Sequence, residues 1–343
     1  MATDRTSIIS ERMPEALLGL RGLMSLAILF LHQIELKVGD SIYFLSAATD
    51  VFFVVSGFSL SFVYGKNLPF TRPVMARYTA NRLARFIPLA WITVSIFFLI
   101  QIAIDLYGFQ RGHPLDTSLH NYVGNLLFLD SNIPGFSSTP SKWFLSNILV
   151  AYIFIFPLTY FLANTRKINI IAIIGIAIFQ IFLWENLALM NHGLFQRCIP
   201  GFLAGCLLYY CHFRIKALPS LLLFVISIPA IVIIPKNYQL IPILCLVLAS
   251  NTDKGIIARI FSIKPLHFLA DIGFSLFLTH QIFTILALAI ITKIPEASSY
   301  YFYWIWILMS AAIFTAYITQ KYFEKPFTKK IKSLLPSPQI TNH

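Results

Sequence analysis

Two ionisable residues, Arg21 and His32, lie eleven positions apart in the first long apolar stretch of the sequence. In an α-helix this spacing brings both side chains to within about 20° of one face, at heights that differ by about 16 Å. A guanidinium binds phosphate oxygens, and an imidazole can remove a proton from a hydroxyl group. Because ionisable side chains inside a membrane are costly, they mark candidate functional sites. A histidine that simply hydrogen-bonds to neighbouring helices fits the same pattern for His32.

A second cationic group lies further along the chain. Arg82 and Arg85 are three residues apart, so they share a helix face, and Arg77 lies about one turn earlier. Arginine binds phosphate in a bidentate manner, so this group suits a polyphosphate ligand. The alternative is that these residues only belong to the excess of Lys and Arg in cytoplasmic loops.

The cysteines give no indication of a metal site. The four cysteines lie within or beside apolar runs and form no CxxC pair: Cys198, Cys206, Cys211 and Cys245. We therefore interpret them as packing residues and expect no bound metal.

The composition indicates the fold class in which these residues must be positioned. Hydrophobic residues make up 57% of the chain and charged residues 12%, whereas soluble domains carry about 25% charged residues. Residues 170–184 and 217–235 contain no charged side chain, and only helices or closed barrels span lipid. We therefore expect an all-α integral membrane protein with one membrane-embedded domain over residues 1–343. The net charge of +12 fits cytoplasmic loops better than nucleic-acid binding.

We expect about ten transmembrane helices within residues 16–322, followed by a tail at 323–343. Six of the 26 Lys and Arg residues then lie on one side of the membrane, and the remainder lie on the other. This asymmetry predicts cytoplasmic termini. The expected helices are 16–36, 47–64, 86–106, 144–162, 168–187, 199–210, 218–234, 240–250, 268–292 and 300–322. The six residues of the outer side are Lys37, Arg111, Lys142, Arg197, Lys236 and Lys293.

The longest outer segment, residues 106–143, is too polar to cross the membrane. Long connections are often functional, so it is either part of a substrate entrance or a plain connecting loop.

Six segments carry a resemblance to a known family. Residues 17–23, running on to His32, resemble the opening of the membrane-bound acyltransferase 3 family, which includes O-acetylases of the lipopolysaccharide, capsule and Nod-factor type. Arg21 and His32 fit its pattern of a basic residue, ten others and a histidine. The other segments follow in the family's order: 50–58, 82–88, 143–146 with 156–157, 275–280, and 324–326, which begins with Glu324.

The resemblance implies an O-acyltransferase that takes acetyl from acetyl-CoA, or another acyl group from its acyl-CoA, with no permanently bound cofactor. The acceptor would be a hydroxyl of an envelope glycan or glycolipid, and the location a bacterial cytoplasmic (inner) membrane. Arg82, Arg85 and Arg21 would hold the donor phosphates. His32 would act as the general base, and Asp50 would orient it.

Trp143, Ser146 and His280 are further candidates for the substrate site, because each falls in a segment that resembles a family motif. For His280, packing in the helix bundle is an equal alternative. A transporter or glycan flippase would share the helices and the buried polar groups. Against that alternative, the sequence shows no internal repeat and no matched pair of Gly/Pro-broken helices.

Overall fold

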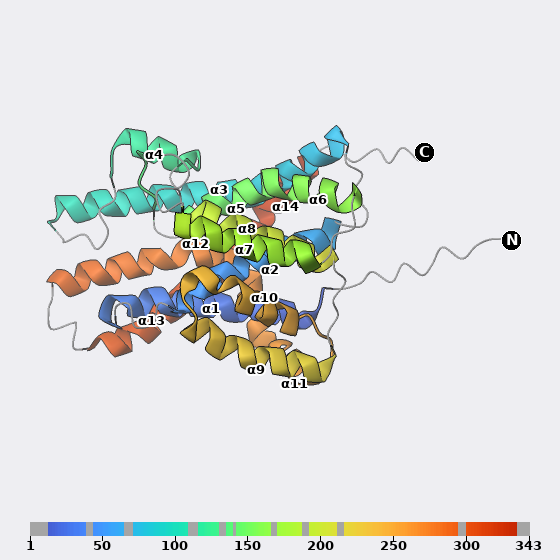
Figure 1. Ribbon diagram of the computed structural model, residues 1–343. Coiled ribbons are helices and arrows are strands. Elements are labelled where there is room, and N and C mark those ends of the chain that lie inside the picture. Colours follow the sequence, from blue (N-terminus) through green and yellow to red (C-terminus); the bar gives the residue numbers. More distant parts are fainter. Residues whose placement is uncertain are drawn as a thin grey trace.

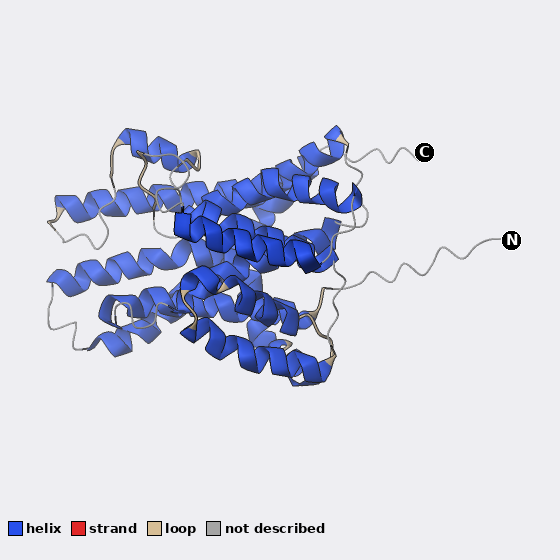
Figure 2. Cartoon of the chain, in the orientation of Figure 1, coloured by secondary structure: helices blue, strands red, loops and turns tan. Residues whose placement is uncertain are grey.

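The computed structural model describes ten segments of the chain and shows only helices and connecting turns within them (Figure 2). The described segments are 13–38, 44–64, 71–108, 116–129, 135–139, 142–165, 170–186, 192–210, 216–293 and 300–334. Within these segments the helices pack into a bundle in which residues distant in the sequence become neighbours (Figure 1).

The helices follow one another with short interruptions. Three π-helical segments, η2, η3 and η6, each continue directly into the next α-helix. The α-helices are α1 (Glu15–Val38), α2 (Ala47–Tyr64), α3 (Arg72–Leu106), α4 (Leu119–Leu126), α5 (Lys142–Val150), α6 (Phe156–Thr165), α7 (Ile170–Asn186), α8 (Ile199–Tyr210), α9 (Ala217–Ile233), α10 (Leu240–Ala249), α11 (Gly255–Phe261), α12 (Lys264–Lys293), α13 (Tyr301–Thr319) and α14 (Lys325–Leu334). The others are η2 (Ala151–Ile155), η3 (His192–Cys198), the 3₁₀ turn η4 (Lys236–Tyr238) and η6 (Gln320–Glu324).

Helices α1 and α12 pack in parallel along their length. Gly22 lies against Ala270, Ser25 against Gly273, and the ring of His32 against the ring of His280. In each pair the two residue numbers differ by 248, so the helices run in the same direction. A Cβ atom at Gly22 would lie 1.9 Å from the Leu266 carbonyl oxygen, so only glycine permits this close approach.

Helices α2 and α8 form a second parallel pair held by glycines. A Cβ atom at Gly57 would lie 2.0 Å from the carbonyl oxygen of Phe202, and one at Gly205 would lie 1.9 Å from that of Val54. At the start of the same interface, Asp50 reaches Arg197. From Asp50 beside Arg197, through Phe53 beside Gly201, to Gly57 beside Cys206, the contacts advance together along both segments, which therefore run in the same direction.

The protein is a multi-pass helical membrane protein. Among the described residues, six segments are long and apolar enough to cross a membrane: Glu15–Ile34, Phe44–Tyr64, Pro73–Leu106, Lys142–Tyr160, Lys264–Ala289 and Phe302–Ile331. If each expected helix crosses the membrane once, the first and ninth must run in the same direction, and so must the second and sixth. Helices α1 and α12 are the first and ninth, α2 and α8 are the second and sixth, and both pairs are parallel. The total of ten passes and the cytoplasmic position of the termini remain predictions.

The observed helix bounds differ from the expected ones in two places that affect the site. Helix α3 begins at Arg72 and not at residue 86, so Arg82 and Arg85 lie within the helix and not at its entrance. The last helix continues through η6 into α14 and ends at Leu334, although residues 323–343 were expected to form a tail. Hydropathy misses both extensions because they are rich in Arg and Lys.

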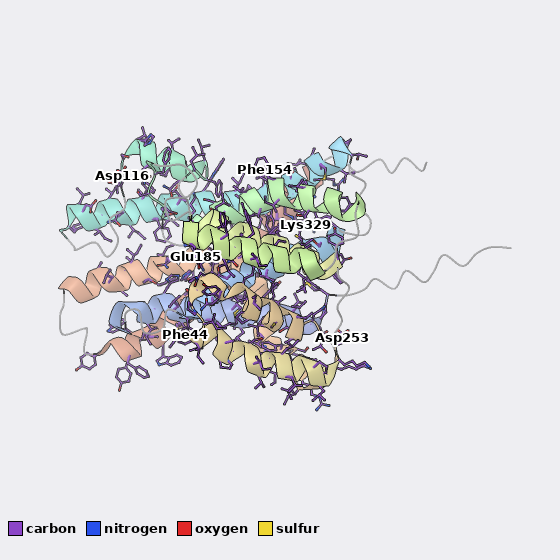
Figure 3. All side chains as sticks on the ribbon, viewed as in Figure 1. Phe44, Asp116, Phe154, Glu185, Asp253 and Lys329 are labelled. Carbon is purple, nitrogen blue, oxygen red and sulfur yellow. The ribbon has the colours of Figure 1, made fainter. Side chains whose placement is uncertain are left out.

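Two short helices also lie outside the expected set. Helix α4 lies within the predicted outer segment, where Ser118 accepts a hydrogen bond from the Asn121 amide and caps the helix. Helix α11 precedes α12. Figure 3 shows Asp116, just before α4, and Asp253, just before α11, at opposite ends of the bundle.

Candidate functional site

A cavity with a volume of about 80 Å³ lies between α1, α2, α3, α5, η2 and α12. Its lining combines cations, hydroxyl groups, an imidazole and aromatic rings. The polar side chains of the lining are Arg21, Ser25, Ser56, Arg82, Arg85, Tyr152 and His280.

Three arginines lie together on the wall of this cavity. Arg21 comes from α1, and Arg82 and Arg85 come from adjacent turns of α3. The structure therefore brings together the residues that the sequence suggested for phosphate binding. Three guanidinium groups around one space form a strongly cationic pocket that suits an anionic ligand.

Aromatic rings fix the position of Arg82. Its guanidinium carbon lies 5.3 Å from the ring centre of Tyr64 and 5.6 Å from those of Tyr78 and Tyr152. Arg82 Nη2 donates a hydrogen bond of 3.1 Å to the Tyr64 hydroxyl, while its buried Nε has no hydrogen-bond partner. Such cation–π contacts stabilise the charge and limit the side-chain rotamers. The unpartnered Nε–H remains available to an incoming acceptor.

The remaining wall of the cavity is largely apolar. Phe52, Phe86, Phe144, Phe274 and Phe277 line it. The ring of Phe144 lies 4.7 Å from that of Phe277, which connects α5 to α12 across the site. An apolar wall beside a cationic group suits a ligand with a charged end and an uncharged chain.

One ring nitrogen of His280 has no hydrogen-bond partner within the described segments. It is 1% exposed, and its Nδ1 lies 3.0 Å from the Leu276 carbonyl oxygen. Because a carbonyl only accepts hydrogen bonds, Nδ1 must carry the hydrogen. In the neutral ring Nε2 then has a free lone pair, and it is buried without a hydrogen-bond partner.

His32 lies next to His280. The ring centres are 5.3 Å apart with an angle of 32° between the planes. Among the described residues, the lining of the cavity includes His280 but not His32. His32 therefore adjoins the cavity through the ring of His280, and the two imidazoles form a pair at the α1–α12 interface.

Asp50, the residue predicted to orient His32, forms an ion pair with Arg197. Arg197 Nε donates to Asp50 Oδ1 at 2.7 Å and Nη2 donates to Oδ2 at 3.1 Å. The side chain of Asp50 is 14% exposed and that of Arg197 is 12% exposed. Lys236 adds a second cation and donates to the Ser46 hydroxyl. Burial and the nearby Arg197 lower the pKa of Lys236 to about 8.

Trp143 and Ser146 lie outside the cavity lining. The ring centre of Trp143 is 5.0 Å from the Arg197 guanidinium carbon, and its ring contacts Phe53 and Phe144 edge to face. Trp143 thus connects the Asp50–Arg197 pair to the aromatic wall. Ser146 is 1% exposed within α5.

Sequence reasoning missed two kinds of residue at the site. The aromatic lining residues were indistinguishable from the many other aromatic residues of an apolar chain. Tyr152, which lines the cavity, and Arg197, which pairs with Asp50, were also missed, and each lies in a π-helical segment. Such segments often occur at functional sites, but no residue pattern predicted them here.

Among the residues that the structure describes, no three His, Cys, Asp or Glu side chains come together as possible metal ligands. Cys198 and Cys206 are buried and free, and the Cys206 thiol donates to the Gly57 carbonyl oxygen at 3.5 Å.

Comparison with known proteins finds one family to which the chain is similar. The family model described as an acyltransferase domain, of the acyltransferase 3 type, matches residues 15–321. The match extends from the start of α1 into η6 and includes every residue that lines the cavity. No curated protein and no solved structure matches the chain.

Proposed function

Because the chain belongs to the acyltransferase 3 family, we propose that this membrane acyltransferase transfers an acyl group, acetyl in particular, from coenzyme A to an envelope glycan. The receiving group is a hydroxyl of a polysaccharide or lipid-linked glycan. One observation carries the proposal: three arginines and the buried imidazole of His280 line the same partly apolar cavity, and the ring of His32 lies directly beside that of His280. An acyl-CoA needs cations for its phosphates, an uncharged passage for its pantetheine arm and a base near its thioester.

Donor binding follows from the arrangement of the lining. The phosphates of coenzyme A contact Arg21, Arg82 and Arg85, and the Nε–H of Arg82 supplies a donor that has no partner within the protein. The pantetheine arm passes along the phenylalanine wall. Its extended length is comparable with the rise of about 16 Å between Arg21 and His32 along α1.

Acyl transfer requires one proton to move twice. His32 takes the proton from the acceptor hydroxyl, whose oxygen attacks the thioester carbonyl carbon. The carbon–sulfur bond breaks, and the imidazolium returns the proton to the departing thiolate. The products are the glycan ester and free coenzyme A. His280, fixed by its Leu276 hydrogen bond, holds the reacting groups beside His32.

The test is a purified, full-length enzyme supplied with acetyl-CoA and a glycan acceptor. The expected result is acceptor-dependent release of coenzyme A together with glycan that gains one acetyl group, measured by mass spectrometry. Arg82→Ala and Arg85→Ala should each weaken coenzyme A binding about ten- to a hundredfold, since each loses a charge-assisted hydrogen bond. Lysine at either position should restore binding only in part.

Lys142→Met provides a matched control, because this lysine packs on the Phe128 ring, with 4.6 Å from Nζ to the ring centre, away from the cavity lining. Its coenzyme A affinity should stay within twofold of wild type. Transport of a glycan without thioester consumption would instead identify a flippase. Unchanged coenzyme A affinity in both arginine variants would remove the proposed donor site.

A further inference from the structure

The C-terminal helix places a carboxylate next to the cationic part of the cavity. Glu324 is the last residue of η6, where α13 passes into α14, and its side chain is 8% exposed. The Ser275 hydroxyl of α12 donates a 2.7 Å hydrogen bond to Glu324 Oε2. The second oxygen, Oε1, lies 3.6 Å from Arg85 Nε. One carboxylate therefore joins α3, α12 and the C-terminal segment.

This contact determines which edge of the Arg85 guanidinium faces a ligand. The Nε edge faces Glu324, and the guanidinium carbon lies 5.9 Å from the Phe86 ring centre and 6.0 Å from that of Phe274. A guanidinium carries its five N–H groups in a rigid planar fork. With the Nε edge held, the terminal Nη groups remain for an acceptor, and Arg85 itself lines the cavity.

The C-terminal segment has other contacts that hold it on α12. Lys325 Nζ forms a 2.8 Å ion pair with Asp271 Oδ2, in which both side chains are more than half exposed. Gln320 also donates to the Asp271 carbonyl oxygen. Exposed ion pairs contribute little, but these contacts attach the segment without the Glu324 charge. A buried carboxylate is costly unless it is paired, so its presence here points to a role at Arg85.

We propose that Glu324 is a positioning residue for the acyl donor: it holds Arg85 so that the Nη edge of the guanidinium faces the donor phosphates. The inference rests on the proposed function, in which Arg85 binds coenzyme A. Glu324 lies three residues beyond the end of the family match at residue 321. The donor site thus extends into the junction between α13 and α14.

The test is a double-mutant cycle in the full-length enzyme in lipid nanodiscs. Glu324→Gln keeps the size of the side chain and an oxygen for the Ser275 hydroxyl but removes the charge. The expected result is a rise of about tenfold in KM for acetyl-CoA, with kcat within twofold of wild type. In the Arg85→Ala background the same substitution should raise KM no further, because Glu324 acts through Arg85.

Lys325→Ala is the matched control, since it removes the neighbouring exposed ion pair on the same segment and should leave KM within twofold. If Glu324→Gln does not fold, Ser275→Ala loosens the carboxylate and should give a smaller rise in KM that also disappears in Arg85→Ala.

The outcomes separate the two proposals. An equal effect of Glu324→Gln in both backgrounds, or a lower KM, would overturn the positioning role. A normal KM for Glu324→Gln beside a raised KM for Arg85→Ala would overturn it as well and leave the donor site intact. A normal KM for Arg85→Ala would overturn the positioning role, and only if coenzyme A affinity were also unchanged in Arg82→Ala would it remove the proposed donor site.

Discussion

His32 and His280 lie 5.3 Å apart between their ring centres, so substitutions can determine which imidazole carries the proton. His32→Ala should lower kcat by about 10²- to 10⁴-fold, the usual effect of removing a general base. Its affinity for coenzyme A should be unchanged, because the phosphates bind about 16 Å away along α1. Single-turnover rates and equilibrium binding of coenzyme A measure the two effects separately.

His280→Ala is the companion variant for this test. It should lower the rate less than His32→Ala, since His280 holds the reacting groups and does not take the proton. Near-normal turnover in a folded His32→Ala protein, with a large loss in His280→Ala, would assign the base to His280.

Substitution of Asp50 or Arg197 should lower the stability of the protein more than its catalytic rate. Asp50→Asn leaves the partly buried Arg197 guanidinium without its carboxylate, which should cost up to about 3 kcal/mol. The double variant with Arg197→Gln should be less destabilised than the sum of the two single variants, because no charge of the pair remains unpaired. Thermal unfolding in detergent measures this. A large fall in kcat at unchanged stability would instead support the expected role of Asp50 in orienting His32.

At the residue scale, the sequence could predict those site residues that are chemically unusual for their surroundings. Arg21, Arg82, Arg85 and His280 stand out in apolar helices, and they meet at one cavity. The partner of Asp50 could not be predicted, because Arg197 is 147 residues away in the sequence. Only the packing of α2 against α8 brings the two together.

At the element scale, the parallel helix pairs depend on glycines at their closest approach. Gly205→Ala would place a methyl carbon 1.9 Å from the Val54 carbonyl oxygen, so α8 must move away from α2. We expect a destabilisation of about 1–3 kcal/mol, as is usual for overpacking, seen as a lower melting temperature. Gly175→Ala in α7 is the control, because its Cβ would meet nothing within 4 Å. Equal melting temperatures for the two variants would contradict the packing described for α2 and α8.

The expected helices agree with the structure where apolar residues continue to the helix end. The second helix has the expected bounds, 47–64. The agreement fails where charged residues extend a helix, as in α3 and α14, or where a short polar helix caps itself, as in α4. Hydropathy detects segments that contact lipid, whereas the charged extensions in α3 and α14 and the short helix α4 are stabilised by packing and capping. The π-helical segments depend on the same tertiary contacts.

At the scale of the whole molecule, the positions of the cavity residues along the bundle predict the side from which each substrate enters. Arg21 lies in the first third of α1 and His32 in the last third, so the arginines are nearer the end of the bundle from which α1 and α12 start. Helix α11 lies at that end, and α4 lies at the other (Figure 1). The charge asymmetry of the sequence predicts that the first end is cytoplasmic. We therefore expect acyl-CoA to enter from the cytoplasm and the glycan from the outer side.

The most direct measurement of this claim uses the purified enzyme reconstituted in vesicles in one known orientation. Acetyl-CoA is supplied only on the side of the α1 start, a glycan acceptor only on the opposite side, and acetylated glycan is measured by mass spectrometry. We predict that product forms in this arrangement, that it is absent when the two substrates are exchanged, and that Arg82→Ala reduces it at limiting acetyl-CoA. Product that forms only when both substrates share one side would contradict a cavity loaded from opposite faces of the membrane.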